Sequence, residues 1–198
     1  MNRNRISRII PIALILIVIA IAVAALVSVG RALFSGGSTQ TVNDSSQTSL
    51  ISTAPDRSVR MTVRGSIVAD ENFRSYQETI SPSDRTLTTY SGYLDQPISS
   101  GQLANNIKAY EEFVFALNRA NMMQGSILTG DSDDTRGICA TGKVYEFEIL
   151  SGTQVEKRLW TSTCKGSPGS LKASVSQLES LFLQQIPTSK ALLSNIKL

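Results

Sequence analysis

An uncharged apolar run near the start of the chain constrains its topology more than any other feature. Residues 9–29 contain no charged side chain. A helix of this length rises roughly 31 Å, which is the thickness of a bilayer's hydrocarbon core. The apolar core of a cleaved signal peptide is shorter, about 7 to 15 residues. We therefore expect residues 9–34 to form an uncleaved signal-anchor helix in the lipid bilayer, with cleavage after the small-residue tripeptides at 22–24 or 28–30 as the alternative.

The arginines around this run predict its orientation. Arg3, Arg5 and Arg8 precede it, whereas only Arg31 follows it before Arg57. Because positively charged flanks stay on the cytoplasmic side, residues 1–8 are expected inside the cell and the rest of the chain outside. The predicted location is the plasma membrane, with a single span.

The net charge of +3 comes from these flanking arginines. Without those four of the 19 basic residues, the chain beyond residue 31 carries 15 basic and 16 acidic residues. A nearly neutral domain does not have the excess of positive charge that neutralises nucleic-acid phosphates. We therefore expect no nucleic-acid partner, and we expect the basic N-terminus to lie at the anionic inner leaflet.

The chain after the span divides by composition into two parts. Residues 35–57 are dominated by serine, threonine, glycine and other small polar residues, a composition typical of a flexible linker. The remaining residues, 58–198, have the usual size of one domain. We expect this extracytoplasmic domain to be the folded part of the protein.

Hydrophobic periodicity predicts an α+β fold for residues 58–198. Alternation of apolar and polar residues over 59–67 indicates a half-buried strand, and 72–80 and 85–94 are weaker strand candidates. Apolar residues recur every three or four positions in 101–123 and in 170–186, as in amphipathic helices. Together with a hairpin described next, these elements predict one antiparallel sheet of about five strands packed by two helices. The expected helix face in the first of these segments comprises Leu103, Ile107, Tyr110, Val114 and Leu117.

The two cysteines flank a predicted hairpin. Residues 143–150 and 155–164 are strand-like, and Ser151-Gly152 between them suits a two-residue turn. This loop places Glu146 opposite Lys157 and Cys139 opposite Cys164. The cysteines then occupy a non-hydrogen-bonded pair with Cα atoms about 4.5 Å apart, which a disulfide can span. Because disulfides persist outside the cytosol, we predict a Cys139–Cys164 disulfide.

The residue types present limit the chemistry of the domain. The chain contains no histidine, which excludes Ser-His-Asp and Cys-His nucleophiles and histidine-bearing metal motifs. Glu146 and Glu148 share one strand face about 7 Å apart, a spacing near that of glycosidase carboxylates. Ser162 and Lys165 match the S-x-x-K pattern. We interpret the glutamates as a solvated face and the S-x-x-K match as chance, and we expect no cofactor and no catalytic residue.

An acidic loop and an aromatic group are weaker site candidates. Asp131, Asp133 and Asp134 offer oxygens that suit calcium, but the loop departs from the calcium-loop pattern, and an acidic surface turn is the preferred interpretation. Tyr145 and Trp160 are candidates for a partner contact, because these residue types are enriched at interfaces, and ordinary packing is the alternative.

The overall architecture resembles that of type IV pilin-like subunits. The shared features are a basic N-terminus, an apolar helix and a small α+β head with a late disulfide. That family has a processing glycine and a glutamate at the start of the apolar segment, which residues 5–16 lack. The sequence therefore favours a non-catalytic module that binds another envelope protein or polymer or takes part in envelope assembly. A surface hydrolase and a pilin-like or secretion-system subunit are the alternatives.

Overall fold

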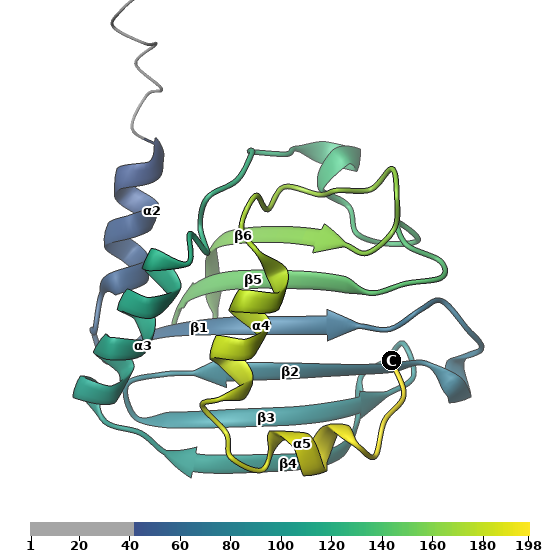
Figure 1. Ribbon diagram of the computed structural model, residues 1–198, viewed down its shortest axis with the longest axis horizontal. Helices are drawn as coiled ribbons and strands as arrows, with labels where there is room; N and C mark the ends of the chain where they lie inside the picture. Colours follow the sequence, from purple (N-terminus) through teal and green to yellow (C-terminus); the bar gives the residue numbers. More distant parts are fainter. Residues whose placement is uncertain (1–41) are drawn as a thin grey trace, which may run out of the picture. The chain divides into compact units, whose positions relative to one another are not determined.

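The computed structural model describes residues 42–198, which form one antiparallel sheet with helices, as the predicted α+β class requires. The sheet has six strands, one more than predicted, in the order β4-β3-β2-β1-β5-β6 (Figure 1). The strands are β1 (Arg57–Arg64), β2 (Arg74–Ile80), β3 (Asp84–Ser91), β4 (Gln96–Ala104), β5 (Val144–Ser151) and β6 (Gln154–Ser162). The helices are α2 (Val42–Ile51), α3 (Ile107–Arg119), α4 (Val175–Leu183) and α5 (Ser189–Leu193), with short 3₁₀ turns η1 (Asp70–Asn72) and η2 (Gly130–Asp133).

The order of the strands follows from two runs of hairpins. Strands β1 to β4 form a meander in which each strand pairs with the next. The chain then passes through α3 and returns on the other side of β1, where β5 pairs antiparallel with β1 and β6 pairs with β5. Strand β1 therefore lies inside the sheet, and β4 and β6 form its two edges (Figure 1).

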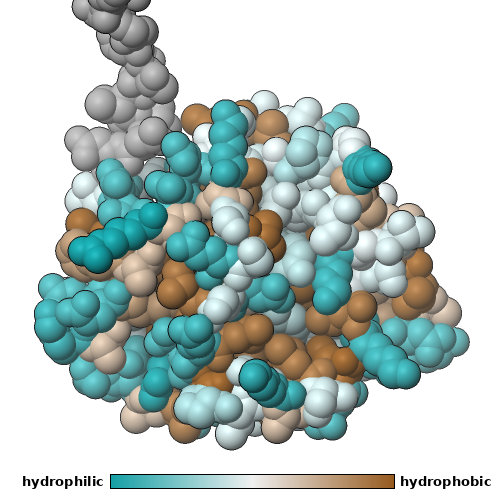
Figure 2. Space-filling view, in the orientation of Figure 1, coloured by the Kyte–Doolittle hydropathy of each residue, from teal (hydrophilic) through white to brown (hydrophobic). Residues whose placement is uncertain are grey.

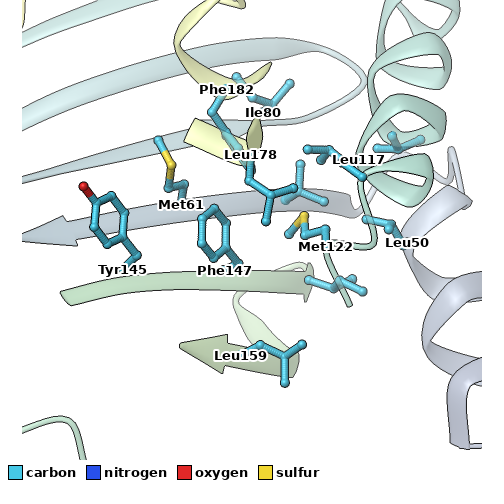
Figure 3. Close-up of a cluster of buried hydrophobic side chains, with 14 of the residues drawn as sticks. Leu50, Met61, Ile80, Leu117, Met122, Tyr145, Phe147, Leu159, Leu178 and Phe182 are labelled. Carbon is cyan, nitrogen blue, oxygen red and sulfur yellow. The ribbon is translucent and has the colours of Figure 1, made fainter. Parts of the chain in front are cut away.

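One face of the sheet is covered by helices and carries the main core. Val59, Met61 and Val63 alternate along β1 and are fully buried on this face. Figure 3 shows Phe182 and Leu178 from α4 and Leu117 from α3 meeting side chains from the sheet. Full burial of a side chain of this size contributes about 1.5 to 3 kcal/mol, so this face supplies most of the stability. On the outside of the helix layer, hydrophilic side chains are interspersed with apolar ones, which gather around α4 and α5 (Figure 2).

Helix α3 begins later than the sequence periodicity predicts. The Asn106 side chain caps it by accepting a hydrogen bond from the Ala109 amide at 2.9 Å. Residues 96–104, part of which the periodicity assigned to this helix, form β4 instead. Leu103 therefore lies on a strand, and Ile107 is exposed at the first helical turn, so neither belongs to the buried helix face. That face consists of Tyr110, Phe113, Val114 and Leu117.

The predicted flexible linker is partly helical. Residues 42–51 form α2, and Leu50 from this helix is only 1% exposed within the main core. The prediction of a coil for all of 35–57 is therefore wrong for residues 42–51, where Leu50 packs in the main core and Ser46 accepts a hydrogen bond from Lys157. The predicted membrane helix, residues 9–34, lies outside the described residues. Within residues 42–198, no helix has the length and apolar character needed to cross a membrane.

The β5–β6 hairpin has a different register from the predicted one. Ser151 pairs with Gln154, so the loop is Gly152-Thr153, and Glu146 faces Trp160 instead of Lys157. Two features change the register. Gly152 has a φ of 58° and occupies the first loop position, where type II′ turns require glycine, and an irregularity between Ile149 and Leu150 shifts the pairing by one further residue. Lys157 instead donates to Ser46 Oγ at 3.0 Å and to the Met123 carbonyl at 3.3 Å.

Candidate interaction site

The two cysteines lie just outside the β5–β6 hairpin. Their sulfur atoms are 2.06 Å apart and their Cα atoms 5.5 Å apart, which confirms the predicted pairing. Cys139 precedes β5 and Cys164 follows β6, so the bond joins the two loops at the open end of the hairpin and not two paired strand residues. Gly142 lies against this bond, because a Cβ at that position would be 2.9 Å from the Cys139 sulfur.

The acidic loop before β5 lies over the sheet face that the helices leave uncovered. Asp133 accepts hydrogen bonds from the Arg158 guanidinium at 2.8 Å and from the Trp160 indole nitrogen at 3.0 Å. Thr135 donates to Glu146 at 3.1 Å. These contacts tie the loop to strands β5 and β6.

Glu146 and Glu148 are both buried, and Glu146 contacts this loop, so the prediction of a solvated face is wrong. Glu148 accepts from Arg60 Nε at 2.6 Å. Glu146 lies between Arg64 and Arg158, at 3.8 and 3.6 Å. Carboxylates in such surroundings need paired cations, because burying an unpaired charge is costly. These ion pairs link β5 to β1 and β6, and Arg158 also binds Asp133 of the loop.

Two aspartates of the acidic loop, Asp133 and Asp134, bind arginine side chains of the protein itself. Asp134 accepts from Arg136, and this hydrogen bond holds the Asp134 pKa at about 2. Asp133 is bound by Arg158 and Trp160, as described above, and Asp131 lies in the first turn of η2. In the part of the chain that the structure describes, no three histidine, cysteine, aspartate or glutamate side chains are grouped to hold a metal ion.

Tyr145 and Trp160 do not form one contact patch. Trp160 is 2% exposed and packs with Cys139 and Val144 on the face opposite the helices. Tyr145 points to the helix-covered face, where burial raises its pKa. It lines a shallow depression of about 360 Å³ together with Ser66, Thr141, Gly142, Lys143, Thr163 and Leu198. The separation follows from the alternation of side chains along neighbouring strands.

The S-x-x-K match begins at the last residue of β6, Ser162, and ends in the turn that follows it. The Ser162 hydroxyl donates to the Ser167 carbonyl at 2.7 Å and accepts from the Cys164 amide at 3.2 Å. Lys165 is exposed in the same turn. The hydroxyl thus stabilises the turn that follows the strand, which is an ordinary structural role.

The exposed edge strand β4 is a feature that the sequence analysis missed. Its nine residues, QPISSGQLA, carry no charge, and most of them are exposed. Two apolar side chains are among the exposed ones, Ile98 at 45% and Leu103 at 37%. Proteins normally protect edge strands with charges, proline or covering segments, because free backbone groups there pair with other chains. On β4, Pro97 and the irregularity opposite Thr89 and Tyr90 interrupt the edge near its start, and the Arg85 guanidinium binds the Ala104 carbonyl at its end.

The hydrogen-bonding pattern shows which groups of β4 point outward. The Asn105 amide donates to the Ser83 carbonyl at 2.8 Å, in register with the Asp84–Ala104 pair. In an antiparallel ladder, hydrogen-bonded and non-hydrogen-bonded pairs alternate. Odd-numbered residues of β4 therefore bond to β3, whereas the amide and carbonyl groups of Ser100 and Gln102 point away from the sheet.

The opposite edge, β6, is protected. The amides of Ser170 and Leu171 both donate to the Trp160 carbonyl at 2.9 Å, and Ser170 Oγ accepts from the Trp160 amide. Earlier in the strand, Glu156, Lys157 and Arg158 place three consecutive charges on the edge. Of the two sheet edges in residues 42–198, β4 is therefore the one prepared for pairing.

Comparison with known proteins gives no family for this chain. No family model matches it, and no curated protein is significantly similar to it in sequence.

Proposed function

We propose that this protein is a non-catalytic, membrane-anchored module whose extracytoplasmic domain binds a protein partner of the cell envelope through the open edge of β4. The observation that carries the proposal is the contrast between the two sheet edges. One is charged and covered by its own chain, and the other is uncharged with outward backbone groups at Ser100 and Gln102. Such an edge can accept an additional strand, with affinity supplied by backbone hydrogen bonds.

The membrane location in this proposal rests on the sequence. The uncharged run of residues 9–29 has the length of a span, and the arginines before it favour an outward-facing domain. The cysteine sulfurs at bonding distance agree with an oxidising compartment. The hydrolase alternative has less support, because Glu146 and Glu148 are both buried and paired with arginines.

Site-specific photo-crosslinking of the full-length chain in native membranes tests the proposal. A photoreactive residue at Gln102 is expected to capture a protein, whereas the same residue at Gln154, exposed on the protected edge strand β6, is expected to capture none. Protease added outside the cell should degrade the domain. The proposal fails if Gln102 and Gln154 behave alike, or if fractionation finds the full-length chain in the cytosol.

A further inference from the structure

We infer that the partner strand is β4 of a second copy of this chain. This inference rests on the proposed function, because it names the occupant of the same edge. Pairing of two β4 strands around a two-fold axis joins two six-stranded sheets into one sheet of twelve strands. Because β6 is covered, the assembly closes at two copies and does not extend into a filament.

The register of this pairing follows from the outward-pointing groups. An antiparallel arrangement centred on Gly101 places Ser100 of one copy opposite Gln102 of the other, and the same pair recurs across the axis. Both residues point their amide and carbonyl groups away from β3, so these two pairs form four backbone hydrogen bonds between the copies.

The side chains of β4 are compatible with this register. Residues 96–104 carry no charge, so no like charges meet when the strand pairs with itself. The partly exposed Leu103 faces Ser99 of the other copy, and a longer side chain is absent at the axis, where Gly101 lies beneath Leu192 of α5. The charges of a charged peptide would find no partner on β4. The uncharged β4 of a second copy therefore fits this edge better than a charged peptide does.

The extent of the contact predicts a weak association. One strand pair buries less than the roughly 1,200 Å² that specific, stable interfaces need. Confinement of both copies to one membrane raises their effective concentration and compensates for this. We therefore expect dimers in the membrane and not in dilute detergent solution.

A disulfide experiment tests the register. Cysteines at both Ser100 and Gln102 would face each other across the axis with Cα atoms about 5.5 Å apart, within the range of a disulfide. The full-length S100C/Q102C chain, oxidised in native membranes, is expected to run as a dimer on a non-reducing gel. The matched control is Q154C/E156C, with the same spacing on the exposed part of β6.

Charge variants test the interaction itself. In S100K/Q102K, a lysine faces a lysine in both pairs, whereas in S100E/Q102K each glutamate faces a lysine. Resonance energy transfer between N-terminally labelled full-length chains in phosphatidylcholine vesicles should show about ten-fold weaker association for the first variant than for the second. Gln102→Pro should also abolish pairing, because its missing N–H faces outward and is not needed within the monomer.

The outcomes separate this inference from the proposed function. Dimers of S100C/Q102C but not of Q154C/E156C support β4 pairing. Disulfide capture of a different polypeptide by S100C/Q102C overturns the second copy as partner and leaves the proposed function standing. Equal dimer yields in both cysteine variants, or equal association of the two charge variants, overturn the inference. A failure of the photo-crosslinking at Gln102 overturns the proposed function as well.

Discussion

Glu78 makes the stability of the domain depend on pH. It points from β2 into the main core, its exposed fraction is 0%, and neither carboxyl oxygen has a hydrogen-bond partner among the described residues. Burial raises its pKa from 4.5 to about 9. Between these two values, the folded protein carries a proton on Glu78 that the unfolded chain has released. The unfolded state binds fewer protons there, so stability is highest below pH 4.5 and falls as pH rises toward 9.

The loss of stability at pH 7 follows from the difference between pH 7 and the pKa of Glu78 in the unfolded chain. Each pH unit above 4.5 costs about 1.4 kcal/mol, so the cost at pH 7 is about 3 kcal/mol. Glu78→Gln removes the ionisable group at nearly constant size. We expect the variant to be more stable than the wild type by up to about 3 kcal/mol at pH 7, and by little at pH 5. Glu78→Met, which removes the buried polar atoms as well, should be more stable at both pH values.

Urea unfolding of residues 43–198, which form one compact unit, measures this effect. Trp160 is the single tryptophan of the chain and is buried, so its fluorescence reports unfolding. The difference in free energy of unfolding between wild type and Glu78→Gln should grow by about 1.4 kcal/mol per unit from pH 5 to 8. Glu112→Gln, at an exposed position, is the control and should show no such slope. A difference that stays constant over this range would refute the reasoning.

Three further changes test other parts of the fold through the same unfolding measurement. Cys164→Ser, or reduction of the disulfide, should lower the free energy of unfolding by about 3 kcal/mol, and reductant should then have no further effect on the variant. Asn106→Ala removes the cap of α3 and should cost about 1 kcal/mol, whereas Asn106→Ser should retain most of the stability. Phe182→Ala should cost about 3 to 5 kcal/mol, because its ring packs on Phe113 and Phe147; a loss below 1 kcal/mol would contradict this packing.

The elements that the sequence predicted are those whose pattern is local. Strand β1 alternates strictly because one face is buried under helices, and α4 shows Leu178 and Phe182 four residues apart. Strand β4 gave no such signal, because an edge strand buries little on either face and needs no alternation. Leu103, Ile107 and Tyr110 are four and three residues apart, as on one face of a helix. The predicted helix therefore extends backwards into β4.

The buried carboxylates depended on contacts distant in sequence. Nothing near Glu146 and Glu148 in the sequence indicates that Thr135 and three arginines contact them, so a solvated face is the ordinary expectation. The signal that was available is the arginines at alternating positions of neighbouring strands, Arg60 and Arg64 on β1 and Arg158 on β6. The disulfide is predicted correctly despite the wrong register, because Cys139 just before β5 and Cys164 just after β6 lie at the same open end of the hairpin whichever residues pair within it.

Glu78, which causes the pH dependence, and the open edge of β4 lie in the same half of the sheet. Glu78 pairs with Leu87 on β3, and Leu87 pairs with Gly101 on β4, so the three residues form one row that ends at the proposed two-fold axis. Binding that occurs only in the folded state raises stability. A second copy on β4 therefore stabilises the strands that Glu78 destabilises above pH 4.5. Linkage is reciprocal, so a substitution such as Glu78→Gln that stabilises the domain affects pairing only through the folded fraction. The pairing affinity should be unchanged where the wild-type domain is fully folded. It should be higher than that of the wild type where the wild-type domain is partly unfolded.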